Sequence, residues 1–99
     1  MQEIEFREFE SFLNKVDYYK LILEIKLENR CLVCLNGQLN SYDFRKEMLK
    51  ISIKKGTPCS TVYIDLTKIE SIYIQNSWFC IKSKDNIEYR ITTIEEVDL

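Results

Sequence analysis

The chain has 99 residues, of which 45% are hydrophobic and 30% charged, and its formal net charge is −2. This length suits one domain, because natural domains cluster at roughly 100 to 150 residues, and the composition excludes wholesale disorder. The apolar runs are short, whereas a membrane-spanning helix needs about 20 apolar residues in a row. The N-terminal segment lacks the basic and apolar regions of a secretory signal. We therefore expect one cytoplasmic domain over residues 1–99, with no membrane partner.

An amphipathic helix is the first element that the sequence predicts, at about residues 3–15. Apolar side chains recur there at three- and four-residue spacing, which places them on one stripe of a helix. The stripe consists of Phe6, Phe9, Phe12, Leu13 and Val16. Glu3 and Glu5 stand in the expected first turn and Lys15 in the last, which is the arrangement that the helix dipole favours.

Strands are expected next, over about residues 19–92. Apolar residues alternate with mostly charged residues from Leu21 to Leu27, which predicts a half-buried antiparallel strand. A second apolar run, from Cys31 to Leu35, ends at Asn36 and Gly37, a pair typical of a two-residue turn. The sequence therefore predicts a hairpin turn at this pair.

The segment 39–48 supports two interpretations. Ser41 could cap a short helix carrying Phe44 and Met48, whereas a turn just before the segment requires a returning strand. Beyond it, alternating patterns return in short runs separated by turn-forming residues. These runs lie at about residues 49–54, 62–66, 69–74, 78–83 and 87–92, with a break at 56–58.

One helix and six to seven short strands place the chain in the α+β class. The expected architecture is an N-terminal amphipathic helix packed on a curled antiparallel sheet or small barrel of six to seven short strands. In either form the helix is expected to bury its phenylalanines against the sheet.

Residues suited to catalysis are scarce. The chain has no histidine, the commonest general base, and only two glycines, so neither a histidine-based mechanism nor a glycine-rich phosphate loop can be formed. We expect no catalytic residue, no cofactor and no enzymatic activity.

Four cysteines match the number of ligands in a structural zinc site, and Cys31 and Cys34 have C-x-x-C spacing. However, residues three apart on a strand point to opposite faces, and Cys59 and Cys80 have no paired spacing. The reducing cytosol also keeps thiols free. We expect buried free thiols and no metal, with a zinc site as the alternative.

Positive charge gathers in the middle of the chain. Residues 18–56 contain four acids and eight bases, whereas both flanking parts are acidic. The basic stripe, as we call it, consists of Arg45, Lys46, Lys50, Lys54 and Lys55. Such a stripe could contact phosphates. Solvation of an open sheet face is the alternative, which the sequence pI of about 5.2 favours.

Tyrosine and tryptophan residues offer a second possible binding surface. They are numerous for one small core, so some should stay exposed, and these residue types dominate binding hot spots. The candidate partner-binding residues are therefore Tyr63, Tyr73 and Trp78, together with the basic stripe. Tyr42, Tyr63 and Tyr73 could also stack on nucleic-acid bases.

A non-catalytic protein-binding module is the function that these features favour. The absence of alanine and the excess of isoleucine and lysine are typical of AT-rich coding, which indicates a low-GC bacterium or its phages. We expect a small inhibitor, immunity or adaptor protein that occludes a partner's surface, and an anti-defence protein such as an anti-CRISPR has these traits. The alternative is a small-barrel nucleic-acid-binding protein using the basic stripe. A homo-oligomer is compatible with either function.

Overall fold

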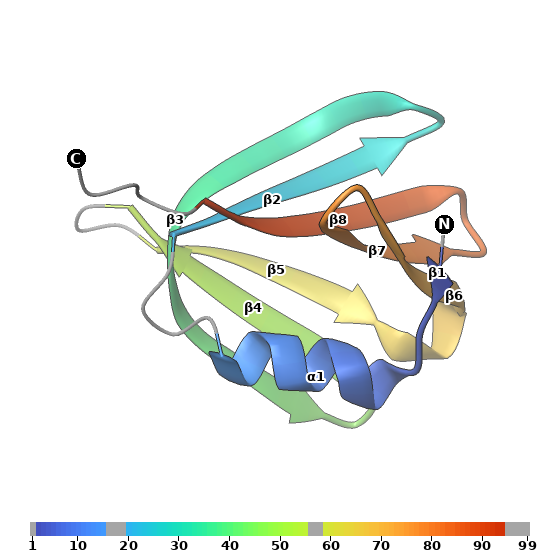
Figure 1. The fold of residues 1–99 in the computed structure, drawn as a ribbon, viewed down its shortest axis with the longest axis horizontal. Helices are drawn as coiled ribbons and strands as arrows, with labels where there is room; N and C mark the ends of the chain where they lie inside the picture. The colour runs from blue at the N-terminus through green and yellow to red at the C-terminus, as the bar shows by residue number, and fades with distance from the viewer. Residues whose placement is uncertain (1, 16–19, 56–58, 95–99) are drawn as a thin grey trace.

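The computed structural model describes residues 2–15, 20–55 and 59–94. These residues form one α-helix, α1 (Phe6–Lys15), one short 3-10 helix, η1 (Leu66–Lys68), and eight strands (Figure 1). The strands are β1 (Gln2–Glu3), β2 (Lys20–Leu27), β3 (Arg30–Arg45), β4 (Met48–Lys54), β5 (Cys59–Asp65), β6 (Ile69–Gln75), β7 (Trp78–Ser83) and β8 (Ile87–Ile94). The strand beyond the expected six or seven is β1, which is too short to show a period.

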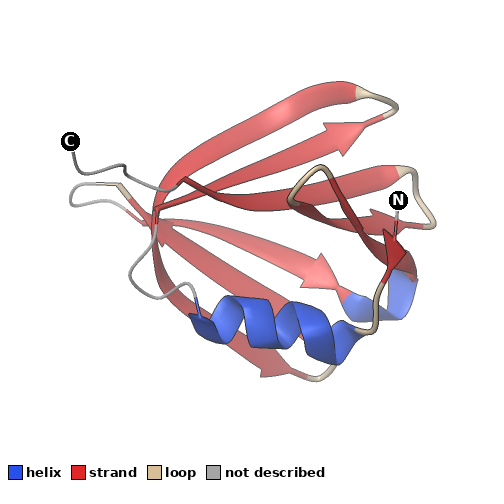
Figure 2. Ribbon diagram, viewed as in Figure 1, coloured by secondary structure: helices blue, strands red, loops and turns tan. Residues whose placement is uncertain are grey.

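All eight strands form one sheet with the order β1-β6-β7-β8-β2-β3-β4-β5, in which neighbours are antiparallel. The sheet is open, because in the described part of the chain β1 and β5 stand at its two ends and do not pair with each other. Figure 2 shows the sheet curling, with α1 along one side. The α+β class and a helix on a curled antiparallel sheet are confirmed, and the sheet does not close into a barrel.

Helix α1 begins later than its sequence pattern indicates. Its first residue is Phe6. Glu3, which was expected in the first helical turn, belongs to β1 and pairs with Tyr73 of β6. The acidic residue in the first turn is therefore Glu8. Val16, the last expected member of the apolar stripe, lies outside the described residues. The helix has ten residues and is too short to cross a membrane, as is every helix in residues 2–15, 20–55 and 59–94.

Phenylalanine rings attach α1 to two separate parts of the sheet. Phe12 stacks on Phe79 of β7 with ring centroids 4.0 Å apart, and Phe6 meets Phe44 of β3 edge-on at 5.1 Å. Strands β8 and β2 lie between β7 and β3 in the sheet. The helix therefore bridges the concave face, and Phe9 between these contacts is fully buried.

One long strand, β3, runs through the hairpin turn expected at Asn36 and Gly37, so that prediction is wrong. Gly37 pairs with Leu21 of β2, and the next residue, Gln38, pairs with both β2 and β4. Gly37 has a φ of 155°, and a Cβ there would lie 2.4 Å from the carbonyl oxygen of Lys54. Glycine is thus needed for a close approach between strands, not for a turn.

The segment 39–48 is a strand followed by a turn, which excludes the helical interpretation. Strand β3 continues to Arg45, and Lys46 and Glu47 form the turn into β4 with positive φ values. Further positive φ values mark the other turns, at Glu28, Asn29, Asn76, Ser77 and Asn86. The break expected at residues 56–58 lies outside the described residues.

The core lies between α1 and the concave face. Its fully buried members are Phe9, Leu13, Leu21, Leu23, Leu49, Ile51, Ile64, Ile81 and Ile91. Ten helical residues rise only about 15 Å, which is less than the reach of the longest strands. Helix α1 consequently leaves part of the concave face uncovered, toward the β2–β3 hairpin.

Candidate functional site

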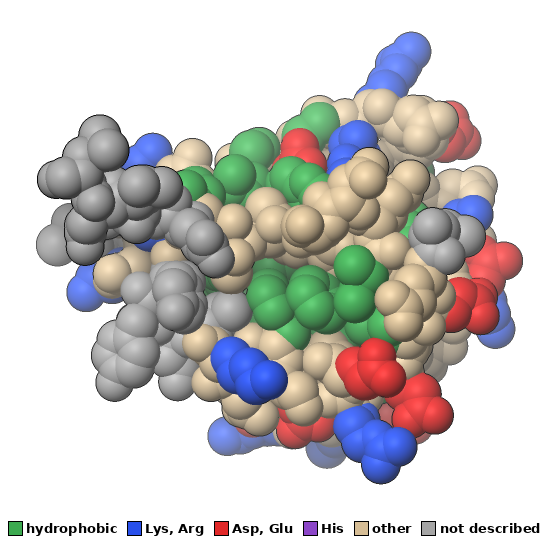
Figure 3. All heavy atoms as spheres, viewed as in Figure 1, with side chains coloured by type: hydrophobic (Ala, Val, Ile, Leu, Met, Phe, Trp, Pro, Cys, Tyr) green, Lys and Arg blue, Asp and Glu red, His purple; other side chains and the backbone are tan. Residues whose placement is uncertain are grey.

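An apolar groove lies where α1 does not cover the concave face. It is a hollow of about 480 Å³ between the free edge of β5 and parts of β2, β3 and β8. Six side chains define the apolar groove: Ile25, Val33, Leu35, Tyr63, Ile87 and Tyr89. Figure 3 shows apolar side chains reaching the surface along the β2–β3 hairpin.

The strand register explains why this part of the core is open. Ile25 pairs with Val33 on one side and with Tyr89 on the other, so these three side chains form one row on the inner face. Leu23 and Ile91 form part of the adjacent inner row, and both are fully buried. Val33, in the row of Ile25, is 37% exposed. The groove is therefore the uncovered end of the core.

Strand β5 supplies one wall of the groove and an unpaired edge. It pairs with β4 from Cys59 to Asp65 without a register shift, and among the described residues no backbone hydrogen bond reaches its other side. Natural edge strands are usually protected by lysine, proline or a bulge, and β5 has none of these. Ser60 occupies an inner position beside buried Val62, yet it is exposed.

A smaller hollow of about 190 Å³ shares Tyr63, Ile87 and Tyr89 with the groove. Its rim carries an ion pair between Lys68 and Asp85, with 3.6 Å between Nζ and Oδ2. Burial raises the pKa of the Tyr89 phenol, and the carboxylates of Asp65 and Asp85 raise it further. The Tyr89 hydroxyl therefore stays protonated at neutral pH, when it can donate a hydrogen bond.

Two lysines of the basic stripe lie on the outer face of β4, next to β5. Lys50 pairs with Tyr63, and Lys54 pairs with Cys59. All four of these side chains are exposed, and Tyr63 is 59% exposed. Tyr63 thus stands at the rim between the apolar groove and the lysines.

The rest of the basic stripe lies at the two ends of β4. Arg45 forms an ion pair with Asp43 at 2.8 Å, which offsets its charge. Lys46 lies in the turn between β3 and β4, and Lys55 follows β4, both exposed. The lysines therefore supply most of the uncompensated charge of the stripe.

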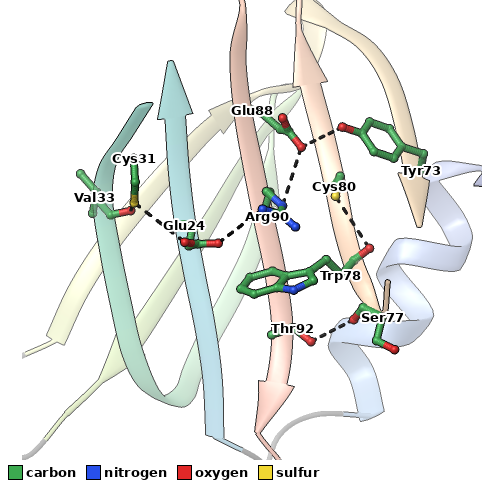
Figure 4. Close-up of polar contacts among 10 residues, drawn as sticks. All are labelled: Glu24, Cys31, Val33, Tyr73, Ser77, Trp78, Cys80, Glu88, Arg90 and Thr92. Atoms are coloured by element: carbon green, nitrogen blue, oxygen red, sulfur yellow. Dashed lines mark hydrogen bonds and ion pairs between the residues drawn. The ribbon is translucent and has the colours of Figure 1, made fainter. Parts of the chain in front are cut away.

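Tyr73 and Trp78 lie on the outer face of another part of the sheet, around Arg90 (Figure 4). The Arg90 guanidinium lies 4.6 Å from the centroid of the Trp78 ring, 3.7 Å from Glu24 and 3.8 Å from Glu88. The Tyr73 hydroxyl donates a hydrogen bond of 2.7 Å to Glu88. The Arg90 guanidinium thus contacts two carboxylates and one aromatic ring.

This Arg90 cluster is internally paired. Tyr73 is only 8% exposed, and burial, together with its hydrogen bond to Glu88, raises the pKa of its phenol. Burial also raises the pKa of the neighbouring Cys80 thiol, which makes it a poor nucleophile. In the part of the chain that the structure describes, every buried side-chain nitrogen and oxygen has a partner. We interpret the cluster as a structural element of the sheet.

The four cysteines are free thiols, but the expected burial is right only for Cys80. The exposed ones are Cys31, Cys34 and Cys59. A β-bulge inserts Leu32 into β3 opposite β2, so Cys31 and Cys34 share the outer face instead of pointing to opposite faces. Within the described ranges, no three His, Cys, Asp or Glu side chains gather in a way that could hold a metal ion.

The candidate residues from the sequence fall on two separate surfaces. Tyr63 and the basic stripe lie around β4 and β5, whereas Tyr73 and Trp78 belong to the Arg90 cluster. Sequence reasoning missed the groove members other than Tyr63. The sequence did contain one signal of such a groove: the strands have more apolar inner positions than one short helix can cover. It could not locate the groove, because that requires the register of strands distant in sequence.

The fold and surfaces define a small open-sheet domain with one helix, an uncovered apolar groove and an unpaired edge strand beside it. In comparisons with known proteins, the chain matches no protein-family model, no curated protein and no solved structure.

Proposed function

We propose that the chain is a non-catalytic protein-binding module whose docking surface is the apolar groove. The observation that carries this proposal is the juxtaposition of uncovered apolar side chains on the inner face, such as Val33 and Ile87, with the edge of β5 that no described strand pairs. Contiguous apolar surface on a small domain typically marks an interaction site, because leaving it in water costs free energy.

The surroundings of the groove also suit a protein partner. Tyr63 combines a large exposed ring with a polar hydroxyl, which is the residue type enriched in binding hot spots. Charged side chains, including Lys50, Lys68 and Asp85, stand around the apolar centre. An apolar centre with a polar rim is the usual anatomy of a protein interface.

By binding through this groove, the chain would occlude the surface of its partner. The lack of histidine and the mutual pairing within the Arg90 cluster support a role without catalysis. A small inhibitor, immunity or adaptor protein of a bacterium or phage, including an anti-defence protein, is the class that we propose.

The test combines capture from the native host with a matched pair of substitutions. Partners retained on the tagged protein after nuclease treatment are identified by mass spectrometry, and their affinities are then measured. Tyr63→Ala should weaken binding by about tenfold or more, as expected for a hot spot. Leu32→Ala is the control, because Leu32 is equally exposed at 59% but lies outside the groove lining. Equal binding by both variants would contradict the proposal.

Nucleic-acid binding is the second candidate, supported by the pairing of Lys50 with Tyr63 on one exposed face. Reversing Lys50 and Lys54 to glutamate should leave the fold intact, because both side chains are exposed. If the protein binds nucleic acid, this double variant should lose binding, and wild-type affinity should fall steeply with salt. A protein partner held mainly by Tyr63 should show a much shallower salt dependence than nucleic acid, so the slope of a salt titration separates the two functions.

A further inference from the structure

We infer that the groove takes an extended segment of another protein, which pairs with the free edge of β5 as a ninth strand. This inference rests on the proposed function and specifies its mode of recognition. The segment would have apolar residues at alternate positions and acidic residues between them.

The edge of β5 favours a strand over a helix. Along Cys59–Asp65 the backbone is extended and free of bulges, and within the described residues it is paired on one side only. An added strand would form main-chain hydrogen bonds with this edge, whereas the backbone groups of a helix are already bonded to one another. Only a strand therefore satisfies both the edge and the apolar surface next to it.

The groove determines the inward side chains of the segment. Neighbouring strands lie about 4.8 Å apart, so a strand added to β5 would extend the sheet over the hollow. Every second side chain would then point to the inner face, as Val62 does in β5. These side chains would meet Ile25, Val33 and Ile87, so apolar residues suit these positions.

Charge on the outer face of the sheet determines which residues suit the outward positions of the segment. Between Asp43 and Asp65 the chain has five bases and three acids; of these acids, Asp43 is paired with Arg45 and Asp65 caps η1. Lys50 and Lys54 stand on the outer face of β4, opposite β5 residues. Outward side chains of an added strand would lie two strand spacings from these lysines, about 10 Å, which is near the screening length at moderate salt. Acidic residues are therefore favoured, with an effect that salt weakens.

Synthetic peptides test this mode directly. The main probe is a seven-residue peptide in which valine alternates with glutamate, and its controls are a scrambled peptide, one with lysine in place of glutamate, and one N-methylated on alternate backbone nitrogens. Binding is measured by titration of fluorescently labelled peptide. Hydrogen exchange of the amides of residues 59–65 reports whether β5 is the site.

We expect the alternating acidic peptide to bind and to slow amide exchange in β5. The N-methylated peptide should bind at least about tenfold more weakly, because it cannot complete the ladder. The lysine peptide should bind about fivefold more weakly at low salt, with the difference lost at high salt. Reversing Lys50 and Lys54 to glutamate should invert this preference, and a substitution at Lys82, on another part of the sheet, should not.

Four results would overturn the inference. The groove would bind a ligand that is not an added strand if the peptide left amide exchange in β5 unchanged, or if the N-methylated peptide bound as tightly as the unmodified one. If the peptide-free protein sediments as a dimer and its β5 amides exchange slowly, the groove is occupied by a second copy of the chain. No binding by any peptide would also refute the inference. The proposed function survives these results if Tyr63→Ala still weakens binding of the captured partner more than Leu32→Ala does, and it fails if the two variants bind that partner equally.

Discussion

Gly37 is the residue at which the two halves of the sheet come together. It lies in β3 where that strand leaves β2 and begins to pair with β4, and its Cα faces the backbone of Lys54 closely. A side chain there would have to displace main-chain atoms, which cannot rotate away as a long side chain can. The curl of the sheet therefore depends on the absence of a Cβ at this position.

Replacing Gly37 with alanine should accordingly destabilise the domain. The new Cβ would lie 2.4 Å from the Lys54 carbonyl oxygen. Overpacking of this kind typically costs about 1 to 3 kcal/mol, and the positive φ adds strain. Asn36→Ala, at the exposed neighbouring position, should change stability by less than about 0.5 kcal/mol. Urea denaturation of both variants measures the difference, and equal stabilities would show that the strands can separate here without cost.

At the level of elements, α1 closes one end of the core and leaves the other open. Its rings contact β3 and β7, which β8 and β2 separate in the sheet. The apolar groove begins where this cover ends. The length and position of the helix therefore determine how much of the concave face stays uncovered, which under the proposed function is the surface available to a partner.

Phe9→Ala tests whether α1 contributes its expected share of stability. The Phe9 ring is fully buried and lies between the rings of Phe6 and Phe12 on the helix and Phe79 on β7. Removing such a ring typically costs about 3 to 5 kcal/mol. Glu8→Ala, on the exposed side of the helix, is the control. A loss below about 1 kcal/mol for Phe9→Ala in denaturant titration would mean that the helix is not docked and could itself bind a partner.

For the molecule as a whole, the order of strands predicts how stability is distributed. Strand β2 pairs along its length with both β3 and β8, whereas β1 and β5 each pair with a single strand in the part of the chain that the structure describes. Local opening costs least where fewer hydrogen bonds and contacts are broken. The middle of the sheet should therefore open last and its two ends first.

Native-state hydrogen exchange checks this distribution. Amides of β2 should exchange only through global unfolding, with protection that falls as denaturant is added. Amides of β5 that point away from β4 should exchange faster, through local opening that costs less free energy than unfolding. Protection of these β5 amides equal to that of β2 in the isolated monomer would show that the edge is already covered, which would remove the basis of the strand-addition inference.

Local patterns in the sequence determined the kinds of elements and most of their positions. The three- and four-residue spacing of phenylalanines indicated α1, and the two-residue period indicated β2 and the later strands, because such patterns depend only on neighbours along the chain. The lack of histidine likewise needs no structure to interpret. Tertiary structure alone decided that Asn36 and Gly37 continue a strand, that a bulge exposes Cys31, and that the apolar groove exists. Each of these depends on which strands lie side by side, and a period of two identifies the face of a residue but not its neighbour across the sheet.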